Sequence, residues 1–582
     1  MLSNTSSPIS RHEVFSRVPK SNAVVYSTFD RSHSYLTCFN ASYLIPAFID
    51  EVYPGDIFSL SGRHLSRLIA SIHPFMSNLT LSAYFFNVPT RLVWNKFKPF
   101  MGERRRPDES ISDSYQVPML NSGSTGVEFG SIFDFCGIPP KVPNLEFSAL
   151  PLRAINLCYN EWFRDENLCP WLQVGGTGST EEALRESEFG DSDQLSNYSL
   201  FKRAKYHDYF TSALPFQQKG PAMSISIGDS AKVDVMGNGR TLGLSTHNGN
   251  YGLVAGNSNQ ALAGNSSLYG ADIKTPWTGV ADMAINVPAG VTTDPVKSGL
   301  TGIAHLENAT GFTISDLRTA IQLQALKELN ARTGTRYKEI INGEWNVTIS
   351  DATLDRPEFL GSYKIPFNIV TVASTVETSE TPQGNLSAYG ITDNSLHFGF
   401  SKAFEEHGYV IGFLCVTTDQ TYQQGLNRMW SRKNRYDFYT PLLANISEQA
   451  VKMKEILAQG SNVKAPDGSA VDDSTFGYQE AWSELRYKPN MITGYMRSTA
   501  PKDKTFDIWH LGALYAPTII DEENLGIPLN EDFINDNTDE ILERVLAVKG
   551  VPQILSDNYF RLKCSRELPI YSVPSYLLGG RL

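Results

Sequence analysis

The sequence predicts a mainly β protein, built as one large β domain whose strands are separated by long insertions that carry a few helices. Two observations favour this class: short apolar runs broken by Gly and Pro occur early and late in the 582-residue chain, and helical stripes are few. Aromatic residues make up 11% of the chain, enough to build a sizeable core, so global disorder is not expected. Length alone suggests about three or four domains. This is only a soft prior, because a single β domain can be much longer than the average domain.

The first part of the chain reads as strands joined by turns. Residues 34–40 alternate loosely, and residues 43–50 form a second apolar run. Pro54-Gly55-Asp56 predicts a turn after that run, because Pro fixes φ and Gly accepts a positive φ. Residues 78–88 are rich in aromatic side chains and contain no breaker, which predicts a largely buried strand ended by Pro89.

Three helices are expected, over residues 152–163, 315–332 and 445–458. Ser315 is a suitable N-cap for the second, and Gly334 ends it. The apolar positions that define the three stripes are Ile155, Tyr159 and Trp162; Leu317, Ile321, Ala325 and Leu329; and Ile446, Ala450, Met453 and Leu457. We interpret all three stripes as core-packing faces.

Residues 221–302 differ from the rest, because they hold 13 of the 44 glycines together with many Asn, Ser and Thr and few charges. Short alternating pieces at 224–227 and 232–235 favour an ordered surface excursion, and disorder is the alternative. Strands return late, at 409–416 and at 553–555 leading to 559–563.

Composition bounds the class of function. The net charge of −12 argues against a free-standing nucleic-acid binder, which normally carries a basic excess. No run of about 18 apolar residues is present and the N-terminus lacks an apolar signal region, so neither membrane insertion nor export is expected. The six cysteines form no CxxC pair, and we interpret them as buried thiols.

No catalytic constellation is visible in the sequence. HExxH, GxSxG and Walker patterns do not occur, and Gly237-Asn-Gly239 is only a fragment of a dinucleotide fingerprint in a Gly-rich loop. Neighbouring acids such as Asp472 and Asp473 read as turns, since catalytic carboxylates face one another across a substrate. We therefore expect no enzyme, no cofactor and no built metal site, leaving open a divalent ion bound by loop carboxylates.

Two groups of cations are candidates for binding single-stranded nucleic acid. The first lies within residues 428–439, where Trp430 and Tyr436 are interleaved with arginines and a lysine, so that rings could stack on bases while cations meet phosphates. The alternative is that these two rings are core and the cations bridge carboxylates. The second group combines cations near the two chain ends, which could share one face.

Several segments of the sequence are similar to those of a known protein family. Several long ones occur along the chain: Ile49-Asp-Glu-Val-Tyr-Pro-Gly-Asp56, Asn160-Glu-Trp-Phe-Arg-Asp-Glu-Asn-Leu168, Lys205-Tyr-His-Asp-Tyr-Phe-Thr-Ser-Ala-Leu-Pro215 and Asn427-Arg-Met-Trp-Ser-Arg432. With these, the chain resembles the major capsid proteins of the gokushovirus group of the Microviridae, small single-stranded-DNA phages. The similarity covers most of the chain except about 221–310.

The resemblance implies an eight-stranded jelly-roll β-barrel of the viral capsid type with long insertions. It implies pentamers and a sixty-copy icosahedral shell around circular single-stranded DNA, with a small basic DNA-associated protein and a pilot protein as further partners. The protein would then reside in the virion, and in the host cytoplasm during assembly. Residues 1–220 and 311–582 would form the two parts of the shell domain, and 221–310 a surface insertion that protrudes at the threefold axes.

Under this interpretation the charge must be segregated, with acids outward and selected cations inward. The candidate DNA-facing residues are Arg11, Arg17, Lys20, Arg428, Arg432, Lys433, Arg435, Arg561 and Lys563. The insertion is the candidate contact with a host receptor or surface polysaccharide, through its large residues Tyr251, Leu268, Tyr269 and Trp277. The alternatives are a β-rich carbohydrate-binding adhesin and a carbohydrate-active enzyme.

Overall fold

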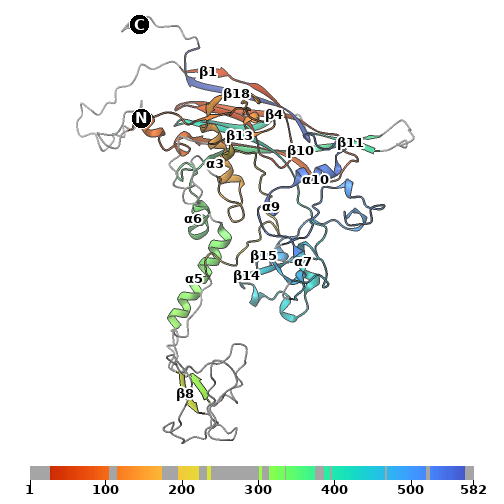
Figure 1. Ribbon diagram of the computed structural model, residues 1–582. Helices are drawn as coiled ribbons and strands as arrows, with labels where there is room; N and C mark the ends of the chain where they lie inside the picture. The colour runs from red at the N-terminus through yellow and green to blue at the C-terminus, as the bar shows by residue number, and fades with distance from the viewer. Residues whose placement is uncertain are drawn as a thin grey trace, which may run out of the picture. The chain divides into compact units, whose positions relative to one another are not determined.

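One large antiparallel sheet dominates the computed structural model (Figure 1). The structure describes residues 26–103, 115–172, 194–221, 233–237, 300–304, 314–334, 336–373, 386–392, 396–465, 468–519 and 525–570. The chain divides into two compact units, one formed by residues 1–219 with 328–582 and the other by residues 220–327. The large sheet belongs entirely to the first unit.

The sheet has the order β1-β18-β4-β11-β10-β5-β13-β3, with β2 also pairing with β18 and β12 also pairing with β4. Its strands are β1 Tyr26–Asp30, β2 His33–Phe39, β3 Ile45–Val52, β4 Ile57–Leu68, β5 Leu79–Pro89, β10 Glu358–Ala373, β11 Leu386–Thr392, β12 Leu396–Ala403, β13 Gly408–Thr418 and β18 Ile554–Glu567. The first and last strands of the described chain are therefore neighbours. Gly55, with φ +93°, makes the turn expected after β3.

The two edges of the sheet approach each other through side chains. Arg31, just after β1, donates to Asp50 of β3 at 2.6 Å. His33 of β2 stacks on Phe48 of β3 with ring centroids 5.8 Å apart, and Phe48 in turn meets Phe560 of β18. The sheet is thus curled over its own core, and the prediction of a mainly β, jelly-roll-type fold is confirmed.

The concave side of the sheet encloses the main core, which includes Phe48, Leu81, Phe85, Phe560 and Leu562. Each large apolar side chain buried there contributes about 1.5–3 kcal/mol. A second core lies on the opposite side of β5 and β13. Because both sides of these two strands are buried, their sequences are nearly continuous apolar runs.

The insertion between β5 and β10 covers that opposite side. Phe86 of β5 and Phe413 of β13 pack against Trp94, Ile155 and their neighbours. The elements of this layer are η2 Thr90–Leu92, α1 Phe97–Phe100, β6 Met119–Asn121, α2 Ile132–Phe135, β7 Glu146–Ser148, α3 Leu150–Cys158, η4 Tyr159–Phe163 and η5 Leu195–Asn197. The helix expected over 152–163 is confirmed as α3 continued by the π-helical η4.

A third, smaller core underlies the insertion between β13 and β18, where Phe210, Tyr422, Met453, Phe476 and Phe533 meet. Its elements are η7 Arg428–Ser431, η8 Arg435–Asp437, η9 Pro441–Leu443, β14 Glu448–Lys452, α7 Met453–Ile456, η10 Val471–Asp473, β15 Thr475–Glu480, α8 Ser483–Arg486, η11 Gly494–Met496, η12 Asp507–Trp509, β16 Thr518–Ile519, β17 Leu525–Gly526, α9 Glu531–Ile534 and α10 Thr538–Val545.

The helix expected over residues 445–458 is wrong. This stretch is strand β14 followed by the four-residue α7, because pairing with β15 takes the first half into a sheet. Met453 and Leu457 are nevertheless buried as expected, whereas Ile446 is exposed.

The helix expected over 315–332 is confirmed as α5 Ile314–Thr333, and α6 Tyr337–Trp345 follows it. Core packing of its stripe is wrong within the single chain, since Ile321 and Leu329 are exposed. Leu323 and Leu326 are exposed on other sides of the helix, so its apolar residues are not gathered on one face. In the smaller unit, β8 Val233–Gly237 pairs with β9 Leu300–Ala304, which confirms the strand expected at 232–235. The strand expected at 224–227 lies outside the described residues.

The prediction of buried thiols is wrong for Cys38, which is exposed because it occupies an outward position of β2. Cys136 is half-buried, and the other four cysteines are buried. Burial raises the pKa of the Cys169 thiol to about 12. Among the described residues no helix combines the length and the apolar character needed to cross a bilayer.

Candidate nucleic-acid interface

On half of the sheet, none of the residues that the structure describes covers the outer side, which we call the bare sheet face. Along β18 and β4, every second side chain is buried in the main core, and the alternate ones point outward. The register sets Tyr559 beside Arg63, and Leu555 beside Arg67. The face consists of Asp30, Leu36, Arg63, Arg67, Leu555, Asp557, Tyr559, Arg561 and Lys563. In Figure 1, β1, β18 and β4 lie together at the top, on the side away from α3.

Cations outnumber acids on the bare sheet face. The cations are Arg63, Arg67, Arg561 and Lys563, and the acids are Asp30 and Asp557, with Glu567 at the outward end of β18. Hydrogen bonds from Ser32 lower the pKa of Asp30, and the nearby Lys563 and Arg561 lower it further, so this carboxylate is ionised. The chain as a whole has a net charge of −12, so the charge of this surface is opposite in sign to that of the whole chain.

The bare sheet face also offers apolar and aromatic surface. Leu36 is 80% exposed, and Leu555 and Tyr559 are about half exposed. A ring flanked by arginines suits base stacking with phosphate neutralisation, which is how single strands are bound without sequence preference. The arrangement can therefore hold a polyanion against a flat sheet.

Arg63 and Arg67 were not among the residues expected from the sequence. Burial alternates strictly over 57–68 and places both arginines on the side opposite Phe58 and Leu60. The sequence itself does not alternate, because Gly62, His64 and Ser66 take inward positions, so it carries only a weak strand signal for the two arginines.

The first predicted group, within residues 428–439 in the loop after β13, is arranged differently. Arg428 donates to the Ala450 carbonyl at 2.9 Å and pairs with Glu455 at 3.3 Å. Arg432 pairs with Glu484 at 3.0 Å. Both carboxylates are almost fully buried, so the charges of these two arginines are compensated inside the fold. Among the described residues, Lys433 and Arg435 have no ion-pair partner.

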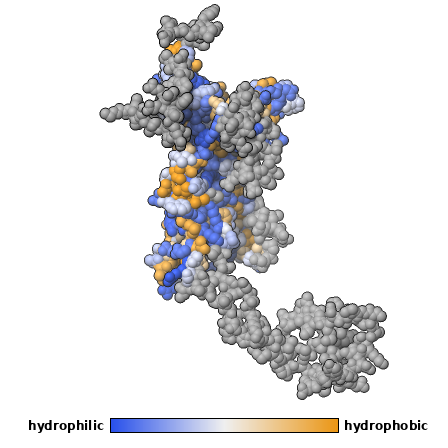
Figure 2. Space-filling view, turned by 90° about the vertical axis from the view of Figure 1, so that its left-hand side faces the viewer, coloured by the Kyte–Doolittle hydropathy of each residue, from blue (hydrophilic) through white to orange (hydrophobic). Residues whose placement is uncertain are grey.

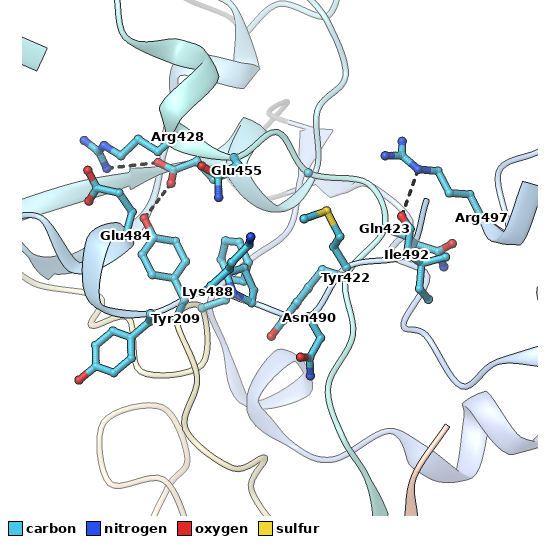
Figure 3. A pocket seen from close by; sticks show the side chains of 16 residues that line it. Tyr209, Tyr422, Gln423, Arg428, Glu455, Glu484, Lys488, Asn490, Ile492 and Arg497 are labelled. Carbon is cyan, nitrogen blue, oxygen red and sulfur yellow. Dashed lines mark hydrogen bonds and ion pairs between the residues drawn. The ribbon is translucent and has the colours of Figure 1, made fainter. Parts of the chain in front are cut away.

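A small cavity lies beneath Arg428 (Figure 3). The Tyr209 hydroxyl donates to Glu455 at 2.8 Å, and Glu484 lies beside the guanidinium. Burial raises the pKa of Glu455, while the Lys452 backbone N–H and Arg428 oppose that shift. The cavity measures about 70 Å³, far below the ~300 Å³ of typical ligand pockets, so this network fastens the loop rather than enclosing a nucleotide.

The aromatic side chains of this loop are not core residues. Trp430 is 70% exposed and Tyr436 is 77% exposed, so the alternative that both are buried is wrong. Its other half, that the cations bridge carboxylates, holds for Arg428 and Arg432.

The structure brings Arg561 and Lys563 together with two further arginines on one face. The loop cations belong to a different region, since β14 and α7, which the loop contacts, lie well below β18 in Figure 1. The remaining predicted residues lie outside the described part of the chain: Arg11, Arg17, Lys20, Tyr251, Leu268, Tyr269 and Trp277. In the described part, no group of three potential metal ligands is brought together.

Comparison with known proteins covers nearly the whole chain. A family model described as "Capsid protein (F protein)" matches residues 16–576. The chain is 40% identical to capsid protein VP1 of Chlamydia phage 1, over 96% of this chain and 97% of that protein. Capsid protein VP1 of Bdellovibrio phage phiMH2K is 38% identical, with 97% and 98% covered. Capsid protein VP1 of Spiroplasma virus 4 is 34% identical, with 95% and 96% covered.

Proposed function

The chain belongs to the capsid protein (F protein) family, and from this premise we propose that sixty copies form an icosahedral shell around a circular single-stranded DNA genome, with the bare sheet face toward the DNA. Membership makes the protein a structural component of the virion, not an enzyme, and it confirms the resemblance to Microviridae capsid proteins. It also sets aside the adhesin and the carbohydrate-active enzyme.

The observation that carries the DNA-facing proposal is the contrast between the two halves of the sheet. The outer side of β5 and β13 is covered by the layer containing α3, whereas no described residue covers the outer side of β18 and β4, which is rich in arginine. A shell of acidic subunits needs such a face, because evenly spread negative charge would repel the genome.

The experiment removes the four cations together, as Arg63→Gln, Arg67→Gln, Arg561→Gln and Lys563→Gln. Each lies at an outward position of its strand, so the core should stay intact and particles should still form. DNA content per particle, read from absorbance ratios and sedimentation, should fall by roughly twofold or more. A matched control replaces the exposed Lys502 and Lys504 by Gln and should leave DNA content unchanged.

The proposal would be contradicted if the four-site variant kept its DNA content and its particle stability unchanged across salt concentrations. Arg11, Arg17 and Lys20 remain proposed contributors to the same DNA-facing surface. Lys433 and Arg435 belong to the loop after β13, away from β18, and this weighs against them in that role. Their ion pairs weigh against Arg428 and Arg432 in that role.

Host contact through the insertion at 221–310 is part of the same proposal. Its support is composition: few charges and many Asn, Ser and Thr, a surface suited to polysaccharide. Deleting residues 230–300 should reduce adsorption to host cells while particles still assemble, whereas loss of assembly would make the insertion a clamp between subunits. A small basic DNA-associated protein, a pilot protein and assembly in the host cytoplasm are proposed from the family resemblance alone.

A further inference from the structure

Residues 429–446 form a surface of large apolar side chains that nothing in the described chain covers; we call it the apolar loop. Leu442 is 93% exposed, and Trp430 and Tyr436 are more than two-thirds exposed. Its exposed apolar members are Met429, Trp430, Tyr436, Phe438, Tyr439, Leu442 and Ile446. Figure 2 shows that other hydrophobic residues also gather in patches on an otherwise hydrophilic surface.

The apolar loop is held in place rather than free to collapse. The Trp482 indole N–H donates to the Leu443 carbonyl at 2.8 Å, and Tyr439 meets the Trp482 ring edge-on at 5.5 Å. Arg432 pairs with Glu484 and lies over the Phe438 ring. A preordered surface loses little entropy when a partner docks on it.

The surface continues onto the segment after Glu484. Leu485, Tyr487 and Met491 are each more than half exposed, and the last two line the cavity whose wall includes Arg428. The apolar loop and this segment are thus adjacent, which makes the patch larger than a run of neighbours in sequence.

The size of the patch points to a protein partner. A fully exposed aromatic side chain presents ~150–250 Å². The seven apolar members of the loop together reach on the order of 800 Å², about what each partner contributes to a stable interface. Patches above a few hundred Å² are unusual on a chain that stays monomeric.

Charge and chemistry favour protein over DNA as the occupant. The two arginines best placed to meet phosphates are already paired with Glu455 and Glu484. Leu442, Ile446 and Met429 provide no stacking plane for a base. Lys433 and Arg435 stand among the apolar side chains and complement a partner with an acidic surface, and this chain itself carries 62 acidic against 50 basic residues.

We propose that the apolar loop is a docking surface for a second copy of this chain, and that its burial between subunits drives shell assembly. The proposal rests on the self-assembly that capsid membership implies, not on the DNA-facing role of the bare sheet face. Around fivefold and threefold axes identical subunits meet through heterologous contacts, and at such an axis the loop would dock onto a different surface of its neighbour.

The test uses two variants of the full chain: Trp430→Ser with Tyr436→Ser, and Leu442→Ser. The subunits should show wild-type circular dichroism and unfolding midpoints, because these side chains are mostly exposed and belong to none of the cores of the described chain. The yield of particles by sedimentation should fall at least tenfold. The control is Met76→Ser, which removes an equally exposed apolar side chain elsewhere and should assemble normally.

Wild-type particle yield in the loop variants overturns the proposal, as does an equal loss in the Met76→Ser control. Normal particles with reduced DNA content also overturn it and make the loop a DNA contact. If a variant fails to fold, hydroxyl-radical footprinting of the unaltered protein tests whether the apolar loop is buried between subunits. Trp430, Tyr436 and Met429 should be oxidised in dissociated subunits and protected in both full and empty particles. Equal oxidation in both states contradicts the docking role. The DNA-facing proposal is tested separately by the four-site variant of the bare sheet face, because that experiment measures DNA content and this one measures particle yield.

Discussion

Arg428 turns its guanidinium toward Glu455 and the Ala450 carbonyl rather than toward solvent. The sequence shows a cation between aromatic residues, a pattern typical of a nucleic-acid contact. The pairing depends on Glu455, 27 residues further along the chain, which only the third core brings into reach. Sequence spacing could not reveal this, because the arginine and its partner belong to different elements.

Replacing Arg428 by Met should therefore destabilise the protein in the absence of any DNA. Losing the partner of a buried carboxylate costs about 3 kcal/mol or more. Burial already raises the pKa of Glu455, and removing Arg428 removes one of the groups that oppose this. The ionised form is the costly one, so the loss should be largest near pH 7.5 and should shrink as the pH falls and the carboxyl group protonates in the folded state.

The measurement is urea denaturation of the purified chain at several pH values, with Lys433→Met as the control. Lys433 lies in the same loop without an ion-pair partner among the described residues, so its replacement should change stability by less than about 0.5 kcal/mol at every pH. A cost for Arg428→Met that is absent, or the same at all pH values, would contradict a structural role for this ion pair.

At the scale of elements, the sheet depends on two bulges that bring glycines close together. The ladder of β10 against β5 skips Leu360, next to Gly361, and that of β12 against β4 skips Gly399. A methyl group on Gly361 would lie 3.0 Å from the Gly399 carbonyl oxygen, and one on Gly399 would overlap the Leu60 carbonyl oxygen. The two strands can cross this closely only because neither Gly361 nor Gly399 carries a side chain.

Gly399→Ala should lower the free energy of unfolding by about 2–3 kcal/mol, because the Leu60 backbone inside the ladder cannot move aside. Gly361→Ala is the matched comparison and should cost less, since a shift of a few tenths of an ångström relieves its contact. Thermal or urea denaturation of both variants measures the difference. An equal effect of the two substitutions would show that the crossing strands adjust together.

Prediction from the sequence succeeded where the local sequence of a segment is enough to indicate its secondary structure. Residues 409–416 are apolar throughout and residues 78–88 are mostly apolar, because both sides of β5 and β13 are buried, and the strands were expected there. It failed at 445–458, where an i, i+4 stripe indicated a helix but pairing with β15 takes the first half into a sheet. It also missed the cations of β4, because their importance appears only when the register sets them beside those of β18.

At the scale of the whole molecule, the negative net charge and the positive bare sheet face are consistent if acids are kept away from that face. The chain carries an excess of 12 acidic residues, yet only Asp30 and Asp557 stand among the four cations. Composition predicts that charge is segregated in a shell around DNA, but it cannot say on which side of the sheet. That choice follows from which half of the sheet the α3 layer leaves uncovered.

If the bare sheet face meets DNA, removing an acid there should strengthen binding, whereas removing an acid elsewhere should not. Asp557→Asn takes one negative charge from between Arg67 and Arg561, so the unassembled chain should bind a thymidine oligonucleotide about two- to fivefold more tightly near 0.15 M salt. Asp503→Asn, an exposed acid outside the face, changes net charge equally and should leave the affinity unchanged. Fluorescence anisotropy across salt concentrations separates the two cases. The same gain from both substitutions would mean that binding responds to net charge alone, and the face would then lose its special role.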